Sequence, residues 1–238
     1  EYISETELDT GTHSLAFTPT GISAGTDTYT KLLLHGDGAD GSTTITDSSS
    51  GGHTVTANGN AQLDTAQKKF GTASLSLDGT DDYVTLDGSS DFAFGLGDFT
   101  VEGWLRFSTL ANNRLFYDSR PDGVTAGDYL TVWFSNGIPV VSKGTTNLIV
   151  GPTAISTDTQ THVAVTRSSG TLRWFINGVL HGSVSDTTSY VNGASRPIIG
   201  ADGAFPNLNE FAGHIDEVRV SNGIARWSTT FIPPSAAY

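Results

Sequence analysis

Glycine, asparagine and aspartate divide the chain into many short apolar segments, and this spacing restricts the fold more than any other feature. From Lys31 onward the segments have apolar side chains at every second position or in a brief run, as β-strands do. No 3.6-residue period lasts for more than a turn or two; Ser90–Gly95 and Asn222–Trp227 are the two places where a short helix is expected. The pattern predicts an all-β fold.

Two tight hairpins are signalled in the second half of the chain. Ser169-Gly170 separates the segments HVAVTRS and TLRWFI, and Asn177-Gly178 separates the second of these from VLHGSV. Asn-Gly readily adopts the positive φ angles of a type I′ turn, which joins antiparallel strands. We therefore predict a three-stranded meander over about Thr161 to Val184.

Alternation within one strand predicts which of its faces is buried. In FTVEGWLRF, the residues Phe99, Val101, Leu105 and Phe107 share one face, and Thr100, Glu102, Trp104 and Arg106 share the other. Many such strands with glycine-rich turns are typical of two packed sheets. The pattern predicts a two-sheet antiparallel fold, either a sandwich or a jelly-roll sandwich.

Composition excludes several classes of partner and site. The formal net charge of −13 disfavours nucleic acid and anionic lipid, because basic clusters supply most of the affinity for both. No apolar run approaches the ~20 residues of a membrane-spanning helix, so no membrane insertion is expected. The absence of cysteine excludes disulfides and zinc-thiolate sites.

The start of the chain differs from the rest. Residues 1–29 are polar and turn-rich, which indicates a lead-in or linker, with an extra strand as an alternative. The apolar pattern begins at Lys31, so we place a single domain over residues 30–238. The sequence contains no methionine, and we therefore interpret it as a fragment or a processed form.

Several motifs carry a family resemblance. In order along the chain they are KLLLHGDG, KFGTASLSLDGTDDYVTL, FGLGDFTVEGWLRF, HVAVTRSSGTLRWFINGVL and FAGHIDEVRVSNGIARW. This series resembles the laminin G-like, concanavalin A-like jelly rolls over about residues 30–238. It looks most like the copies in tailed-phage virion proteins, which often have a similar ARW triplet and FIPP tail. The resemblance implies a virion-surface or extracellular location.

The fold hosts lectins, adhesins, glycanases and structural modules, so function depends on the site. Glycoside hydrolysis needs two carboxylates that face one bond. The glycanases of this fold resemble one another in a Glu-x-Asp-x(x)-Glu strand that is missing here, and Glu102 stands alone in its strand. Asp216 and Glu217 are adjacent, so on a strand they point to opposite faces. We therefore predict that the domain is not an enzyme.

The strand around Asp216 raises a question of geometry. Ile215, Val218 and Val220 cannot all share one face of a regular strand, which predicts a bulge or burial on both sides. We interpret Asp216 as an ion ligand or a loop anchor, and Glu217 as the partner of a basic group such as Arg219.

Calcium is the cofactor that the acidic loops suggest. The loop GDGADG (36–41) matches a dinucleotide motif formally, but no helix follows it and its carboxylates would repel phosphate. Carboxylates and carbonyls crowded by glycines suit calcium, although the same residues also form simple Asx turns. The resemblance implies a structural calcium ion with Asp216 as side-chain ligand and Asp37 or Asp78 close by.

A carbohydrate site would combine an aromatic face with a few polar groups. Trp104 and Trp133 lie opposite the regular apolar rows of their strands, and the loops 119–128 and 201–210 are longer than hairpins need. The candidate ligand-binding residues are Trp104, Arg106, Tyr117, Asp118, Trp133, Phe205 and Asn207. The alternative is that these aromatic residues simply pack within the sandwich.

Three functions remain open from the sequence. The first is a non-catalytic recognition module of a phage virion or tail protein that binds a carbohydrate or another host-surface ligand. The second is a structural or decoration module that contacts other virion proteins, and the third is a glycan-degrading enzyme. The ligand and the oligomeric state are left open.

Overall fold

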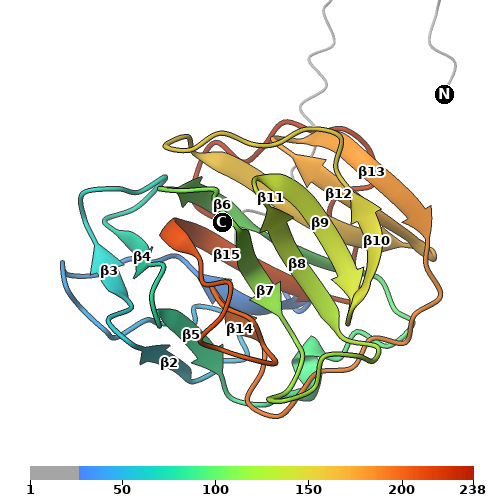
Figure 1. The fold of residues 1–238 in the computed structure, drawn as a ribbon, viewed down its shortest axis with the longest axis horizontal. Coiled ribbons are helices and arrows are strands. Elements are labelled where there is room, and N and C mark those ends of the chain that lie inside the picture. The colour runs from blue at the N-terminus through green and yellow to red at the C-terminus, as the bar shows by residue number, and fades with distance from the viewer. Residues whose placement is uncertain (1–26) are drawn as a thin grey trace, which may run out of the picture.

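The computed structural model describes residues 27–238, which form two antiparallel sheets of eight and seven strands packed face to face (Figure 1). The predicted all-β jelly-roll sandwich is confirmed. The lead-in predicted over 1–29 lies almost wholly outside the described residues, and the first strand begins at Thr30. Residues 27–238 contain no helix with the length and apolar character that a bilayer crossing requires.

The eight-stranded sheet has the order β13-β12-β11-β6-β15-β4-β3, with β1 also paired to β15. Its strands are β1 (Thr30–Leu34), β3 (Gln62–Asp64), β4 (Ser74–Asp78), β6 (Phe99–Phe107), β11 (Thr161–Ser168), β12 (Thr171–Ile176), β13 (Val179–Ser185) and β15 (Ala212–Asn222). On the side of β15 away from β6, β4 pairs with its first half and β1 with its second half, so these two strands lie end to end.

The seven-stranded sheet has the order β10-β9-β8-β7-β14-β5-β2. Its strands are β2 (Val55–Asn58), β5 (Tyr83–Leu86), β7 (Asn113–Asp118), β8 (Leu130–Ser135), β9 (Ile138–Lys143), β10 (Thr146–Val150) and β14 (Ile198–Ile199). Strands β7 to β10 form a continuous antiparallel run, visible in green and yellow in Figure 1.

The predicted meander forms as expected. Strands β11, β12 and β13 pair in sequence, and the turn residues Ser169, Gly170, Asn177 and Gly178 all have positive φ angles between 48° and 75°. Two consecutive residues with positive φ define the type I′ turn, whose twist matches that of the strands it joins. The sequence signal was sufficient because these contacts are local.

One of the two expected short helices is present. Ser90–Phe92 is a 3₁₀ turn capped by the Ser89 side chain. The helix expected at Asn222–Trp227 does not form, because β15 continues to Asn222. The backbone N–H groups of this segment bond elsewhere, Gly223 N–H to Asp98 O and Arg226 N–H to Thr100 Oγ1, instead of closing helical turns.

The core lies between the sheets and is rich in aromatic rings. Phe107 of β6 contacts Phe134 of β8 with ring centroids 4.9 Å apart, and Phe134 contacts Trp174 of β12 at 5.7 Å. The predicted inward row of β6 is buried as expected; its residues Phe99, Val101, Leu105 and Phe107 are at most 1% exposed. Thr100, Glu102, Trp104 and Arg106 therefore point to the outer face of the eight-stranded sheet.

A bulge interrupts β15, as predicted from its apolar residues. The register against β6 shifts between Asp216 and Arg219, and Glu217 has a φ of 51°. This one irregular residue allows Ile215, Val218 and Val220 all to be buried, at 0–1% exposure. The bulge therefore reconciles the apolar pattern with a continuous strand.

Candidate functional site

A cavity of about 320 Å³ opens on the outer face of the seven-stranded sheet. It lies over β7, β8, β9 and the start of β10, with one wall from the loop after β14. Its lining is Asn113, Leu115, Arg120, Thr131, Trp133, Ser142, Gly144, Thr145, Asn147, Asp202 and Asn209. Polar side chains predominate, with one large aromatic ring among them.

Strand alternation explains why the cavity is polar. Leu130, Val132 and Phe134 of β8 are in the core, so the intervening Thr131 and Trp133 face outward. Ser142 of β9 is paired directly with Thr131 and faces the same side. The same strands therefore supply apolar residues to the core on one face and the cavity floor on the other.

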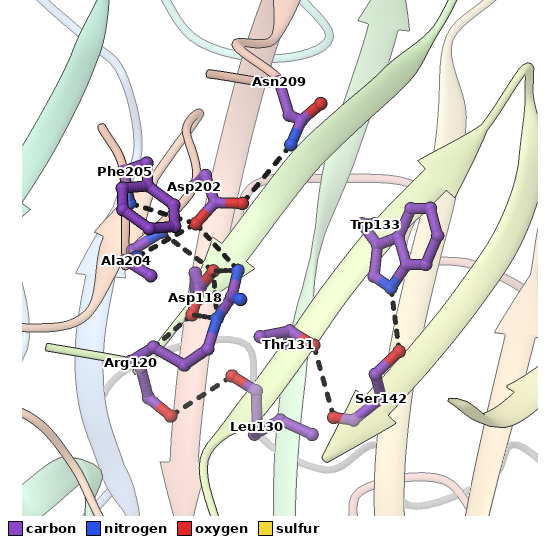
Figure 2. Close-up of polar contacts among 12 residues, drawn as sticks. Asp118, Arg120, Leu130, Thr131, Trp133, Ser142, Asp202, Ala204, Phe205 and Asn209 are labelled. Atoms are coloured by element: carbon purple, nitrogen blue, oxygen red, sulfur yellow. Dashed lines mark hydrogen bonds and ion pairs between the residues drawn. The ribbon is translucent and has the colours of Figure 1, made fainter. Parts of the chain in front are cut away.

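The indole of Trp133 is held in place by a short hydrogen-bond chain. Trp133 Nε1–H donates to Ser142 Oγ at 2.9 Å (Figure 2). The Ser142 hydroxyl donates in turn to Asn147 Oδ1 at 2.8 Å. Trp133 is partly exposed, whereas Ser142 is buried. A partner for its N–H limits the ring's rotation, so a flat aromatic surface is presented in one orientation.

Arg120 is clamped between two carboxylates at the other side of the cavity. Its Nε donates to Asp118 Oδ2 at 3.0 Å, and its Nη2 donates to Asp202 Oδ1 at 2.9 Å (Figure 2). Asp202 Oδ2 in turn accepts from Asn209 Nδ2 at 3.3 Å. The clamp thus connects β7 to the loop after β14.

The clamp also holds its charges in the ionised form. Burial on its own would lower the pKa of the Arg120 guanidinium, but Asp118 and Asp202 outweigh it and raise that pKa. Burial raises the pKa of Asp118, yet every hydrogen bond to its oxygens comes from an N–H group, of Arg120 or of the Gly203 backbone. A protonated carboxyl would have no acceptor there, so the contacts hold Asp118 as a carboxylate.

These features suit recognition rather than bond cleavage. A fixed aromatic ring can stack on the apolar face of a ligand ring. Amide and hydroxyl groups can donate or accept hydrogen bonds to the ligand's polar groups, and a guanidinium can donate them. Asp202 is the one carboxylate in the lining, and it is already engaged by Arg120 and Asn209. The cavity can therefore contact a ligand that combines apolar surface with hydrogen-bonding groups.

The candidate ligand-binding residues are distributed over four places: the cavity, the core, an adjoining hollow and the other sheet. Trp133 lines the cavity, and Asp118, fully buried, lies behind it and positions Arg120. Tyr117 is 0% exposed with its hydroxyl buried, so it belongs to the core rather than to a ligand surface. Phe205 and Asn207 line an adjoining hollow of about 630 Å³, next to the cavity wall formed by Asp202.

Trp104 and Arg106 lie on the other sheet, away from this cavity. Trp104 is only 5% exposed, because Lys69 Nζ lies 4.0 Å from its ring centroid and Phe70 packs at its edge. Arg106 forms an ion pair with Asp158 at 2.8 Å. Trp104 therefore packs, as the alternative interpretation of the sequence proposed, and the structure does not bring it together with Trp133.

The outer face around Trp104 is covered by the C-terminal segment and contains a buried charge network. Glu102, 0% exposed, accepts from Arg219 Nε at 2.8 Å and from Trp227 Nε1 at 2.6 Å. The Tyr238 ring lies 3.7 Å from the Arg219 guanidinium, and its hydroxyl is 3.0 Å from His162 Nε2. Glu102 is thus a structural ion-pair partner shielded from solvent.

Burial and charge act in opposite directions on Glu102. Burial alone would raise the pKa of its carboxyl, but Arg219 and His162 outweigh it and lower the pKa to about 2. Glu217 pairs with a basic group as expected, but that group is His35 and not Arg219, which pairs with Glu102. The bulge turns Glu217 toward His35, whose Nδ1 lies 3.0 Å from its carboxylate, and toward the backbone N–H of Tyr238 at 3.1 Å.

The three predicted calcium ligands are not gathered at one point. Asp78 pairs in register with Ala212 and Asp216 lies four residues further along β15, which is on the order of 13 Å of strand. Asp37 accepts from the backbone N–H and hydroxyl of Thr72, and Asp78 accepts from Thr80 N–H at 2.7 Å. Within residues 27–238 no three His, Cys, Asp or Glu side chains form a group that would hold a metal ion.

Asp216 differs from the other two carboxylates. Its Oδ2 accepts from the backbone N–H groups of Lys69 at 2.6 Å and Phe70 at 3.1 Å. Its Oδ1 is buried with no hydrogen-bond partner among residues 27–238, and burial raises the pKa of this carboxyl to about 6. Asp216 thus anchors the loop before β4, one of the two roles expected from the sequence.

Sequence reasoning missed several residues of the cavity. Arg120 and Asp202 are 82 positions apart, and nothing in either local pattern indicates their contact. Ser142, Asn147 and Asn209 are polar residues at strand positions or in loops, where polar residues are common. Outward alternation in β8 and β9 was the one available signal, and it identifies Thr131 and Ser142 together with Trp133.

Fold and site together define a β-sandwich domain with a polar, aromatic cavity on one sheet. The chain belongs to the concanavalin A-like lectin/glucanases superfamily, whose laminin G-like family model matches residues 78–227. The predicted family is confirmed at this level. No curated protein sequence matches the chain.

Solved structures with the same fold include toxin and accessory domains. The receptor binding domain of botulinum neurotoxin C/D mosaic serotype has a TM-score of 0.62 and 15% identity over 83% of this chain. The binding domain of botulinum neurotoxin DC in complex with SialylT has a TM-score of 0.61 and 14% identity over 84% of this chain. This chain spans about half the length of these toxin domains, 49% in each case.

A third neighbour is similar in length. Domain 4 of AbnA, an extracellular GH43 arabinanase from Geobacillus stearothermophilus, was solved in complex with arabinotriose. It has a TM-score of 0.61 and 21% identity, covering 82% of this chain and 93% of that domain. At these identities the likeness establishes the shared fold.

Proposed function

We propose that this domain is a non-catalytic carbohydrate-recognition module that acts outside the cell and binds a glycan in the cavity over β7–β10. The observation that carries the proposal is Trp133, an outward, partly exposed tryptophan held by Ser142 across the cavity from the Arg120 clamp. Two neighbours of the same fold are described with SialylT and arabinotriose bound, which supports a sugar as the ligand.

The arrangement of the carboxylates supports a non-catalytic role. Glu102, the one glutamate in β6, is buried under Trp227 and paired with Arg219. Glu217 is 1% exposed and occupied by His35 and Tyr238. Hydrolysis needs two carboxyl groups that flank a bound sugar, and neither of these reaches a ligand on the surface.

A glycan array probed with the 238-residue chain, followed by calorimetry on the best glycan, tests the proposal. We expect Trp133→Ala to weaken binding by about tenfold or more, because a central aromatic contact dominates such sites. Trp133→Phe keeps an aromatic ring but loses the bond to Ser142, so its glycan affinity should lie between those of the wild type and Trp133→Ala. Absence of glycan binding, or equal binding by Trp133→Ala with an unchanged melting curve, would refute the proposal.

The phage virion is the setting that we propose from the sequence resemblance. In that setting the module sits at the virion surface and attaches to a host glycan. Labelling intact particles with an antibody to this domain is the direct test. Labelled particles whose adsorption to the host is blocked by the antibody would support the proposal. Detection of the domain only inside the host cell would contradict it.

A second candidate function is a structural module that contacts other virion proteins. It is favoured by exposed apolar residues on the edge strands β10 and β13 and on the nearby C-terminal segment: Val150 is 56%, Val179 54% and Ile232 89% exposed. β10 and β13 lie close to each other across the two sheets. Val179→Lys and Ile232→Lys would abolish assembly and leave glycan binding intact if this edge makes the contact.

A further inference from the structure

The charges around the cavity indicate which class of glycan it takes. Arg120 is the only cation in the lining, and it lies against two carboxylates, Asp118 behind it and Asp202 beside it. One guanidinium against two carboxylates leaves this cluster with an excess negative charge. A ligand carboxylate would meet that excess at short range, where Coulomb repulsion is largest.

The guanidinium still has a free donor for a neutral group. Nε and Nη2 are taken by the carboxylates, whereas Nη1 makes no hydrogen bond to residues 27–238 (Figure 2). A sugar hydroxyl can accept from Nη1 without bringing charge. The remaining polar lining consists of amides and hydroxyls, including Asn113, Asn147 and Thr131, which suit hydroxyl groups equally well.

The cations near the cavity have partners of their own. The buried Arg196 donates to the backbone carbonyl of Arg120 at 2.6 Å and forms an ion pair with Asp122 at 3.3 Å, so Asp122 balances its charge. Lys143 follows Ser142 on β9, but its Nζ is paired with Asp128 at 3.2 Å. Arg114 lies in an adjoining hollow beyond Asn113 and Asn209, with Glu210 in the same hollow. The chain as a whole carries a formal net charge of −13, which adds a repulsive background for anions.

We infer that the cavity selects neutral glycans and rejects sialylated, uronic-acid and sulfated ones, with the Asp118–Arg120–Asp202 clamp as the specificity determinant. The inference rests on the proposed glycan-binding function and adds the chemical class of the ligand. In this arrangement Arg120 acts as a hydrogen-bond donor and does not serve as an anion receptor.

The test compares matched glycans on one array. Each neutral oligosaccharide, including arabino-, galacto- and gluco-oligosaccharides, is printed beside a sialylated, uronic-acid or sulfated counterpart. We expect binding to a neutral member, with its acidic counterpart weaker by about tenfold or more. Equal or tighter binding of the acidic member overturns the inference while the proposed function stands. Binding to none of the probes overturns the proposed function and the inference with it.

A charge variant tests the determinant. Asp202→Asn keeps an oxygen for the N–H groups of Ala204 and Phe205 but removes one negative charge from the clamp. We expect the ratio of acidic to neutral affinity to rise by on the order of three- to tenfold. Asp81→Asn removes one charge from an exposed turn between β4 and β5 that lines no part of the cavity, and should leave the ratio unchanged.

Three outcomes of this comparison are possible, and each decides the role of the clamp. A raised ratio in Asp202→Asn with an unchanged one in Asp81→Asn supports it. An unchanged ratio in Asp202→Asn, in a protein that melts as the wild type does, overturns the clamp as determinant. A parallel rise in both variants does so too, because it would mean that net charge alone sets the preference.

Discussion

The outer faces of the two sheets are built by the same alternation but end in different environments. On the eight-stranded sheet, Glu102 and Trp104 point outward and are then covered by the Lys69–Phe70 loop and the segment Trp227–Tyr238. On the seven-stranded sheet, Thr131 and Trp133 point outward and line an open cavity. An outward side chain is therefore available to a ligand only where no other part of the chain lies over it.

The covered face also explains why a charge network is tolerated there. Glu102 and Arg219 are 0% and 2% exposed, and each is paired with the other. Taking either ion out of water is costly unless its partner remains, so the pair is vulnerable to loss of one member. On the open face the Arg120 clamp is likewise satisfied, but one nitrogen is left for a ligand.

The largest effect is expected from breaking the covered network. Arg219→Met leaves Glu102 buried without its main counter-charge, which should lower the free energy of unfolding by about 3–5 kcal/mol. Chemical denaturation measures this loss. Arg106→Met is the control: Arg106 pairs with Asp158, which is 63% exposed, so the change should cost less than about 1 kcal/mol. Equal losses of unfolding free energy in the two variants would mean that the buried ion pair contributes no more to stability than the exposed one.

The two outward tryptophans allow a direct comparison of the faces. Trp104→Ala opens a hole under Lys69 and Phe70 and should cost about 3 kcal/mol in stability, with glycan affinity unchanged. Trp133→Ala should do the reverse, with a loss of glycan affinity and a smaller loss of stability, since its ring is partly exposed. Thermal melts and calorimetry on both variants separate the two roles. A loss of affinity in Trp104→Ala would contradict the assignment.

Acid should weaken the covered face through Glu102. Its folded-state pKa of about 2 is below the ordinary value of 4.5, so the network's contribution is complete above pH 4.5 and is lost as the pH falls toward 2. The loss should amount to on the order of 2–3 kcal/mol, and it should be missing in Glu102→Gln. Denaturation curves between pH 5 and 2 measure the two slopes. If the free energy of unfolding falls with pH equally steeply in the wild type and in Glu102→Gln, Glu102 has the same pKa in the folded and unfolded states, and this prediction is wrong.

Calcium is expected to have the smallest effect, and it concerns the covered face. If an ion binds the unpartnered Oδ1 of Asp216, free calcium at tenfold its Kd should stabilise the fold by about 1.4 kcal/mol. The melting temperature should then fall when a chelator is added, and Asp216→Asn should abolish that response. The same melting temperature with calcium and with chelator would remove the proposal.

Asp216 itself predicts a pH trend of opposite sign to that of Glu102. Its pKa of about 6 in the fold lies above the ordinary 3.8, so ionising it in the folded state costs stability as the pH rises through this range. Glu102 titrates mainly at lower pH, so the two effects occupy neighbouring windows. Asp216→Asn should therefore flatten the stability profile between about pH 4 and 6.

The sequence by itself determined the features that depend on neighbouring residues. Alternation in β6 and β8 separated inward from outward side chains, because successive strand residues point to opposite faces. The Asn177-Gly178 hairpin followed from local backbone preferences. The apolar spacing of Ile215, Val218 and Val220 predicted a bulge or burial on both sides, and the structure places a bulge at Glu217. These predictions need no knowledge of which distant segments meet.

Only the tertiary structure decided which outward residues remain open. Trp104 and Trp133 look alike in sequence, but a distant loop and the C-terminal segment lie over one face, and the other stays open. The contact of Arg120 with Asp202 likewise joins distant positions. Such contacts arise from burial and charge pairing between remote segments, and local patterns do not encode which segments meet. The covered and the open face were therefore distinguished by packing alone.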